Sequence, residues 1–343
     1  MGGGEAVKAA YVRVPFRTEL REVPVPEPAS DEVLVRVSAC GVCGTDLHNA
    51  RDQAKGEAMP LGHEFCGTVE RVGPGAGDFR PGEKVIVENH TALGRSAAAK
   101  NGDLVNSTDL YVTMGQPCMA EFVKTHVLAL HRSRSLTAVE AAIAEPLTVA
   151  LDLVESSEIG LGSTVAIFGA GPIGLMALAL VRLKGAAKAV ISQPSHSRAR
   201  IELARKLGAD RVVLSDREDL VAVLRGECPE GFDRILVTAP PAAIPPAFQA
   251  ARFGGIVTFN GISYADSRIS FDANAFHFQR LQLRATHSIP NLRFPMAIAL
   301  LERKAIDARD FVTHTFPLDR VEEALKTAET DKARVIKVVV TVG

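Results

Sequence analysis

The sequence has no excess of charge of either sign, no long apolar run and few cysteines, and each of these absences narrows the class of protein. The 39 basic and 40 acidic side chains give a net formal charge of −1. Such a balance offers no electrostatic reason to expect nucleic acid or an anionic membrane as a partner. No apolar run reaches the length of a membrane span, and residues 1–10 lack the apolar run of a signal peptide. We therefore expect a cytoplasmic protein that binds neither nucleic acid nor membrane.

The cysteines are odd in number and scattered, which does not fit a set of disulfide bonds. There are five of them: Cys40, Cys43, Cys66, Cys118 and Cys228. A reducing compartment fits this pattern, and a cysteine with a chemical role would act there as a thiolate. We interpret Cys40 and Cys66 as small buried side chains of the core.

The chain length predicts two domains, and the two parts differ in pattern. Of the 343 residues, 47% are hydrophobic. Short strands at 33–37, 68–72 and 84–87 indicate a β-rich first part, and residues 91–116 show no period and are expected to form an extended loop. From about Leu136, strands alternate with helices, which indicates a parallel sheet covered on both faces.

Three segments outside that alternation are also predicted as regular structure. Residues 138–155 are rich in helix formers and are predicted as a helix interrupted by Pro146. An amphipathic helix is expected at 318–327 and a closing strand at 335–340.

A glycine motif follows one predicted strand in the arrangement that binds dinucleotides. The apolar run 164–168 is followed by Gly169-Ala170-Gly171-Pro172-Ile173-Gly174 and then by a predicted helix. The first glycine allows a tight turn, the second lets the backbone approach a pyrophosphate, and the third lets the helix pack closely on the strand. Pro172 and Ile173 open the helix, whose N-terminus attracts the anion. The alternative is a glycine-rich turn that binds nothing.

The end of the next predicted strand indicates which dinucleotide is bound. In an NAD-binding fold, an acidic residue about 20 residues after the glycines binds the ribose 2′-hydroxyl. This chain has Ser192-Gln193-Pro194-Ser195-His196-Ser197-Arg198 there, with no carboxylate to repel a 2′-phosphate. We expect the hydroxyls of Ser192 and Ser195, with Arg198, to hold that phosphate, so the sequence favours NADP over NAD. In the alternative, Arg198 is a solvated charge and Gln193 hydrogen-bonds the ribose of NAD.

Side chains suited to a metal occur in three segments. Cys40-Gly41-Val42-Cys43 comes first, His63-Glu64 follows, and Glu145 lies much later. A catalytic zinc needs about three nitrogen, sulfur or oxygen ligands and one open position, which Cys43, His63 and a carboxylate would supply. The Cys-x-x-Cys pair also fits a thioredoxin-like redox motif or half of a structural zinc site. A redox motif would open a helix after a strand, whereas a polar Gly-Thr-Asp turn is expected here, and no second such pair follows.

These motifs together resemble the zinc-containing medium-chain dehydrogenase/reductase family. The resemblance rests on Gly41-Val42-Cys43-Gly44-Thr45-Asp46-Leu47-His48, on Gly62-His63-Glu64 and on the glycine motif, in that order. It implies a Rossmann doubly wound parallel sheet joined to a β-rich GroES-like catalytic domain. Residues 1–146 and 289–343 would form the catalytic zinc-binding domain, and residues 147–288 the NAD(P)-binding Rossmann domain.

The resemblance also implies roles for the metal-binding side chains. Cys43 and His63 correspond to zinc ligands, and Glu64 to a carboxylate that binds zinc directly or stands behind a ligand. Glu145, in a Glu-Pro-Leu sequence similar to that of the polyol, sugar and threonine dehydrogenase branches, corresponds to an acidic group at the metal. In the alternative, Glu145 is only a charge at a helix end.

Three residues of the same motif are implied in proton transfer. Thr45 resembles the hydroxyl that takes the proton of the substrate alcohol. Asp46 resembles the group that orients the ligating histidine. His48 would extend the proton path to solvent, and its alternative is a solvated loop histidine.

One segment departs from the family. Many members hold a second, structural zinc with four closely spaced cysteines. The corresponding segment here, residues 90–118, contains a single cysteine, Cys118. We therefore expect one catalytic zinc and no structural zinc, with this lobe ordered by packing or by a neighbouring subunit.

The expected function is a zinc-dependent transfer of hydride between NAD(P) and a secondary alcohol or ketone of a polyol, sugar, cyclitol or amino-cyclitol. A zinc-bound alcohol would lose its proton more readily, which prepares the hydride transfer. The alternatives are a threonine-type amino-alcohol dehydrogenase, a zinc-free quinone or enone reductase of the same superfamily, and a nucleotide-binding protein without catalysis. A homodimer or homotetramer is expected by resemblance.

Overall fold

The computed structural model describes residues 6–343, which divide into two units. Unit 1 comprises the chain up to Thr148 together with Ile289–Asp331 and Lys337–Gly343, and unit 2 comprises Val149–Ser288 with Lys332–Ile336. Within residues 6–343 we find no helix that is long and apolar enough to cross a membrane.

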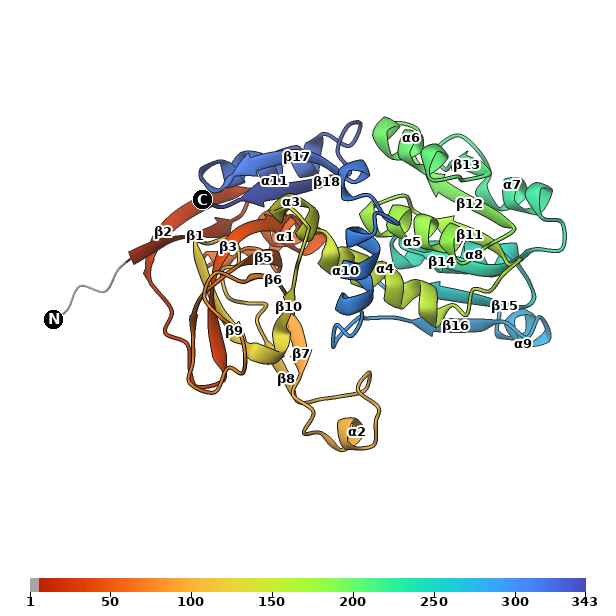
Figure 1. Ribbon diagram of the computed structural model, residues 1–343. Helices are drawn as coiled ribbons and strands as arrows, with labels where there is room; N and C mark the ends of the chain where they lie inside the picture. The colour runs from red at the N-terminus through yellow and green to blue at the C-terminus, as the bar shows by residue number, and fades with distance from the viewer. Residues whose placement is uncertain (1–5) are drawn as a thin grey trace. The chain divides into compact units, whose positions relative to one another are not determined.

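Unit 2 is built on a parallel sheet of six strands (Figure 1). In chain order the strands are β11 (Thr164–Phe168), β12 (Lys188–Gln193), β13 (Arg211–Leu214), β14 (Phe232–Val237), β15 (Ala251–Phe259) and β16 (Gln282–Ala285). Their order across the sheet is β13-β12-β11-β14-β15-β16, with every neighbouring pair parallel. This is the strand order of the doubly wound dinucleotide-binding fold, so the predicted Rossmann sheet is confirmed.

Helices connect these strands, as the alternating pattern predicted. They are α5 (Pro172–Leu183), α6 (Arg198–Lys206), α7 (Leu220–Glu227), α8 (Ile244–Ala250) after the 3-10 turn η3 (Pro241–Ala243), and α9 (Ala273–Phe278). The central strand β11 is buried from Val165 to Phe168, because helices cover both faces of such a sheet. The continuous apolar run seen in the sequence is the consequence.

Unit 1 is β-rich. Its largest sheet has the order β10-β6-β5-β3-β18-β17, with β9 also paired to β3. These strands are β3 (Glu32–Gly41), β5 (Glu64–Val72), β6 (Lys84–Val87), β9 (Phe122–His126), β10 (Leu130–Arg132), β17 (Val312–Pro317) and β18 (Lys337–Thr341). A second sheet has β1 (Ala6–Arg13) between β2 (Arg17–Pro24) and β4 (Met59–Pro60). Strands β17 and β18 bring the end of the chain against β3, which carries the cysteine motif.

The helices of unit 1 are short or peripheral to these sheets. They are α1 (Gly44–His48), the π-helical turn η1 (Asn49–Gln53), α2 (Ala97–Lys100), η2 (Val127–Ala129), α3 (Ala138–Ala141), the start of α4 (Ala144–Ser156), α10 (Phe294–Glu302), η4 (Ala308–Asp310), η5 (Leu318–Arg320) and α11 (Val321–Thr330). The predicted interruption at Pro146 is misplaced, because the break falls between α3 and α4. Pro146 lies in the first turn of α4, where its missing N–H breaks no helical hydrogen bond.

The extended loop predicted for residues 91–116 is wrong in part. Strands β7 (His90–Ala92) and β8 (Leu110–Val112) pair there, and residues 93–109 between them form a lobe that carries α2 (Figure 1). Asp109 accepts hydrogen bonds from the backbone N–H of Arg95 at 2.7 Å and of Ser96 at 2.9 Å, and from the hydroxyl of Ser107 at 2.8 Å. The carboxylate of Asp109 thus joins the two ends of the lobe, near residues 95 and 107. These contacts follow no hydrophobic period, so the sequence pattern did not indicate them.

Replacing Asp109 with alanine should loosen the lobe. Burial alone would raise the pKa of Asp109, but the hydrogen bonds from Ser107, Arg95 and Ser96 outweigh it and hold the pKa well below its ordinary value. Because the pKa is lowered by folding, this carboxylate stabilises the lobe above the unfolded pKa of about 3.9 and loses that effect as the pH falls further. Hydrogen exchange of residues 95–107 should therefore accelerate in Asp109→Ala at pH 7, and in the unmodified protein below about pH 4.

Asp103→Ala is the matched control, since Asp103 lies in the same lobe and its carboxylate contacts Asn106, three residues later in the sequence. Equal acceleration in both variants would contradict the role assigned to Asp109.

Candidate metal and cofactor sites

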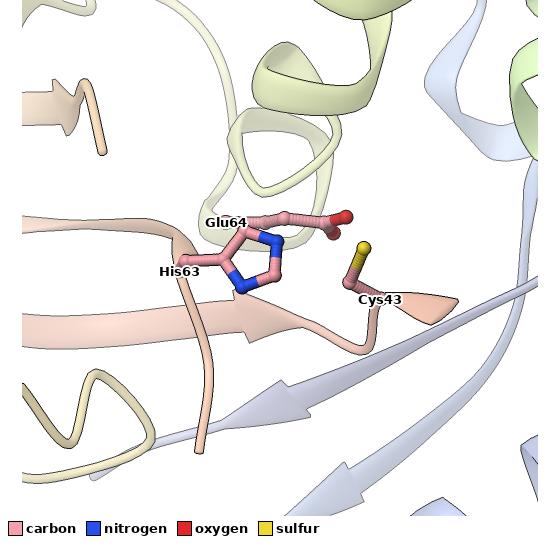
Figure 2. Close-up of side chains that lie close together, drawn as sticks. All are labelled: Cys43, His63 and Glu64. Atoms are coloured by element: carbon pink, nitrogen blue, oxygen red, sulfur yellow. The ribbon is translucent and has the colours of Figure 1, made fainter. Parts of the chain in front are cut away.

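Cys43, His63 and Glu64 form one cluster in unit 1. One ligand atom from each lies within 4.8 Å of the others, close to the span that a zinc ion bridges with bonds of about 2.0–2.3 Å. Figure 2 shows the thiol, the imidazole ring and the carboxylate directed toward one another. The structure therefore brings together three of the four side chains predicted to bind a metal.

The pairing of β3 with β5 explains why these side chains meet. Gly41 at the end of β3 is opposite Glu64 at the start of β5 in an antiparallel register. Strand β3 ends just before Cys43, and β5 begins just after His63. In the antiparallel pair these two strand ends lie next to each other. Two segments that are 20 residues apart in sequence are thereby placed side by side.

The predicted polar turn after the cysteine pair is wrong. Cys43 is the N-cap of helix α1, which directly follows β3, so the local context is the one expected of a redox motif. Cys40, however, lies inside β3 and is fully buried, and this burial raises the pKa of its thiol well above the ordinary value. A buried thiol of this kind is a poor redox partner, so Cys40 is a core side chain as expected.

Asp46 joins the two segments that carry the cluster. Its carboxylate accepts a hydrogen bond from the N–H of Cys43 at 2.9 Å and another from the N–H of Gly62 at 2.9 Å. Both amides lie in or next to residues of the cluster. Asp46 therefore positions the backbone on either side of the cluster, while its influence on the His63 ring is electrostatic.

Lys337 accompanies Glu64 in the interior. The pairing of Val339 on β18 with Gly41 brings Lys337 to the cluster, where its Nζ lies 2.5 Å from Oε2 of Glu64 and donates to the carbonyl of Val42 at 2.9 Å. Burial by itself would lower the pKa of Lys337, but the negative charges of Glu64, Cys43 and Glu145 and the hydrogen bond to Glu64 together outweigh it, so the pKa is raised and the ammonium stays charged. A Cβ at residue 41 would lie 2.1 Å from Oε2 of Glu64, so glycine leaves the room for this pair.

Glu145 is held near the same cluster from helix α4. Its side chain is buried, and Nδ2 of Asn89 donates to its Oε1 at 2.8 Å. Oδ1 of Asn89 in turn lies 3.0 Å from Nδ1 of His90, which fixes the orientation of the amide. Burial, followed by the negative charge of Glu64, raises the pKa of Glu145 to about 7. These charges of neighbouring residues act on the Glu145 carboxylate, which disfavours the alternative that Glu145 is only a charge at a helix end.

This donor set fits a divalent cation. Glu64 and Glu145 are buried acids, the half-buried thiol of Cys43 lies beside them, and Lys337 supplies a positive charge against them. Buried like charges are costly unless a cation compensates them, and a dication would cancel the excess. A mixture of thiolate, imidazole and carboxylate is the set that zinc accepts.

The proposed proton-transfer residues lie on α1. Oγ1 of Thr45 is 3.8 Å from Sγ of Cys43, at the edge of the cluster. Thr45 and His48 are three residues apart in this helix and thus share a face. His48 is buried rather than solvated, and its Nδ1 lies 3.4 Å from Oδ2 of the half-exposed Asp52. The alternative of a solvated loop histidine is therefore wrong.

The glycine motif of unit 2 has the geometry of a phosphate-binding turn. Gly169 has φ +103°, and Gly171 is the N-cap of α5 with Pro172 at its first position and Ile173 next. A Cβ at Gly174 would lie 2.0 Å from the carbonyl oxygen of Gly169, whereas a Cβ at Gly171 would meet nothing within 4 Å. The third glycine thus allows the helix to pack on the strand, and the second leaves its surroundings open, as the motif requires.

The residues after β12 are arranged differently from the prediction. Oε1 of Gln193 accepts a hydrogen bond from the N–H of Ala170 at 2.9 Å, and the buried Ser192 accepts one at its carbonyl from the N–H of Gly169 at 3.2 Å. Arg198 is exposed at the start of α6. The segment 192–198 contains no carboxylate of its own, but the parallel pairing of β12 with β13 places Asp216 against Ser195.

Asn89, Lys337 and Asp216 were missed by sequence reasoning. Lys337 had a signal, because it is a lone charge inside a predicted strand that is otherwise apolar. Asp216 also had one, because it follows a strand expected to lie beside the one that ends at Gln193. Asn89 had no such signal in the sequence, since an asparagine shortly after a strand is common in loops.

Comparisons with known proteins agree with this fold and site. The family model of the alcohol dehydrogenase GroES-like domain matches residues 29–133, and that of the zinc-binding dehydrogenase matches residues 172–303. The sorbitol dehydrogenase of Macaca fascicularis is 30% identical over 92% of this chain and 91% of its own length. The L-threonine 3-dehydrogenase of Pyrococcus abyssi is 31% identical over 92% of this chain and 93% of its own.

Solved structures match over nearly the whole chain. A zinc-binding dehydrogenase from Sinorhizobium meliloti 1021 bound to NADP gives a TM-score of 0.87 at 28% identity, covering 98% of this chain and 99% of that chain. The alcohol dehydrogenase TADH from Thermus sp. ATN1 gives a TM-score of 0.89 at 27% identity, covering 98% of this chain and 100% of that chain. A GroES-like part with a metal-binding cluster and a dinucleotide-binding sheet define the class as a zinc-dependent dehydrogenase. The chain belongs to the zinc-containing medium-chain dehydrogenase/reductase family and is an NAD(P)-linked alcohol dehydrogenase that acts on CH–OH groups.

Proposed function

We propose that this protein interconverts a secondary alcohol and a ketone on a polar substrate such as a polyol, sugar or cyclitol. The observation that carries the proposal is the cluster of Cys43, His63 and Glu64 with Glu145 held nearby. The similarity to sorbitol dehydrogenases supports a substrate with several hydroxyls. A threonine-type amino alcohol is the second candidate, supported by the similarity to L-threonine 3-dehydrogenases.

We assign one zinc per chain to this cluster. Cys43 and His63 would bind it, with Glu64 or Glu145 as the carboxylate ligand, and a bound zinc would supply Lewis acidity toward the substrate hydroxyl. Asn89 occupies Oε1 of Glu145, which leaves Oε2 for the metal. Because Lys337 already pairs with Glu64, Glu145 would be the carboxylate more readily available as a ligand to a bound zinc.

Thr45 would accept the proton of the substrate hydroxyl, and His48 with Asp52 would carry it to the surface. Their positions along α1 and η1 support this order, since Thr45 lies at the cluster in α1 and Asp52 lies half-exposed in η1. In unit 2, the glycine turn from Gly169 to Gly174 would bind the pyrophosphate of the nicotinamide cofactor.

Residues 1–146 with 289–343 would form the catalytic domain, and residues 147–288 the cofactor-binding domain. A homodimer or homotetramer stays a prediction; β16 ends the six-stranded sheet, and an edge strand of this kind can pair with another chain. A cytoplasmic location also stays a prediction, supported by five cysteines that form no disulfide bond.

Removal of the metal tests the proposed function. The purified protein should contain about one zinc per chain and oxidise polyols, inositols or threonine with NAD or NADP, because one cluster supplies the ligands. A chelator should abolish this activity, and added zinc should restore it. Full activity of a protein that contains no zinc would favour the quinone or enone reductase, and tight cofactor binding without turnover on any alcohol would favour a non-catalytic protein.

A further inference from the structure

The loop after β12 contains a carboxylate that belongs to a different strand. Ser195 follows β12 and Asp216 follows β13, and the parallel pairing of these strands brings the two residues together. The N–H of Ser195 donates to one carboxylate oxygen of Asp216 at 2.7 Å, and its hydroxyl donates to the other at 2.7 Å. Both donors of Ser195 are therefore engaged with a single carboxylate.

The carboxylate of Asp216 is solvent-exposed and ionised at neutral pH. The hydroxyl and the N–H of Ser195 hold the pKa of Asp216 below its ordinary value. Arg217 follows it in sequence and also lowers this pKa by its charge. The negative charge is consequently fixed in place by two hydrogen bonds rather than carried on a freely rotating side chain.

The position of this carboxylate relative to a dinucleotide follows from the fold. The carboxyl end of the second strand of the sheet, β12 here, is where the ribose of the adenosine half binds. Gln193 at that end is tied to the glycine turn through Ala170, so the turn that binds the pyrophosphate and the end of β12 form one surface. Ser195 and Asp216 border this surface two residues beyond Gln193 and two residues beyond β13.

We propose that Asp216, positioned by Ser195, selects NAD over NADP. A 2′-phosphate would need the two donors of Ser195, which Asp216 already occupies, and it would meet a negative charge. The exposed Arg198 begins α6 and the exposed Arg217 follows Asp216, and their charges reduce the repulsion without freeing those donors. This inference rests on the proposed use of a nicotinamide cofactor and reverses the preference for NADP expected from the sequence.

The test is direct binding of NADH and NADPH, measured by calorimetry on the full chain without substrate. The unmodified protein should bind NADH more tightly than NADPH. Asp216→Asn removes the charge from an exposed position and should shift the ratio of the two dissociation constants about tenfold toward NADPH. Glu230→Gln removes the same charge at the turn before β14, at the opposite end of a parallel sheet, and should leave the ratio unchanged.

Tighter binding of NADPH by the unmodified protein, or an unchanged ratio in Asp216→Asn, would overturn the inference while leaving the dehydrogenase function intact. If neither dinucleotide bound, the proposed function itself would fail, and the inference with it. Because the measurement requires neither zinc nor an alcohol, an incorrect substrate assignment cannot produce either result.

Discussion

Replacing Cys43 with serine should reduce alcohol oxidation by at least about a thousandfold, since the Lewis acid supplies several kcal/mol of transition-state stabilisation. Serine keeps the size of the side chain but exchanges a thiolate for a hydroxyl, which is a weak zinc ligand at neutral pH. The zinc content measured by atomic spectroscopy should fall together with kcat. The affinity for NADH should be unchanged, because the glycine turn lies in unit 2 and Cys43 in unit 1.

Cys228→Ser is the matched control for this experiment. Cys228 follows α7 in unit 2, whereas the metal-site cluster belongs to unit 1, and its thiol contacts the carbonyl of Gly231 at 3.1 Å. The control should keep its zinc and its activity. A fully active Cys43→Ser enzyme with normal zinc content would refute the assignment of this thiolate as a ligand.

Replacing Lys337 with methionine should lower the free energy of unfolding of the zinc-free protein by about 3–5 kcal/mol, the range for removing one partner of a buried ion pair. The loss comes from Glu64, whose carboxylate is buried and would face no ammonium. The destabilisation should be smaller when zinc is present, because the metal supplies positive charge to the same carboxylate. Urea unfolding with chelator and with zinc would measure both values.

Lys188→Met provides the comparison for Lys337→Met. Lys188 pairs with Glu227 at 2.6 Å, but both side chains are about 30% exposed. Such an exposed pair contributes about 0–1 kcal/mol, so this variant should be nearly as stable as the unmodified protein. The role assigned to Lys337 would be wrong if both variants lost the same small free energy of unfolding. It would also be wrong if zinc did not change the free energy that Lys337→Met loses.

Sequence reasoning succeeded where a function depends on a short segment. The glycine motif could be recognised because turn, helix start and close packing are all determined within residues 169–174. The strands of unit 2 other than β16 were predicted for the same reason, since burial on both faces favours continuously apolar runs. Strand β16 was not predicted, because its residues are exposed or half-buried. In unit 1, β1 and β2 were not predicted, because a half-exposed antiparallel strand leaves a weaker pattern.

The errors concern contacts between distant segments. The predicted turn after Cys43 became helix α1, because Asp46 caps it through the N–H of Cys43 and also binds Gly62 of another segment. The absence of a carboxylate from residues 192–198 was judged along one strand, whereas the loop after the neighbouring strand places Asp216 against Ser195. The bond between Cys43 and Asp46 is local, whereas Gly62 and Asp216 are close to their partners in space and not in sequence.

The sequence by itself determined the kinds of chemistry that this protein carries: thiolate, imidazole and carboxylate groups for a metal, and a glycine turn for a pyrophosphate. Those properties reside in single side chains and in local backbone freedom, which a chain displays before it folds. Only the tertiary structure decided how the charges are balanced, with Lys337 against Glu64, Asn89 against Glu145 and Asp216 against Ser195. The physical reason is that a charge is stabilised by whatever lies within a few ångströms of it, and strand pairing between distant segments determines those neighbours.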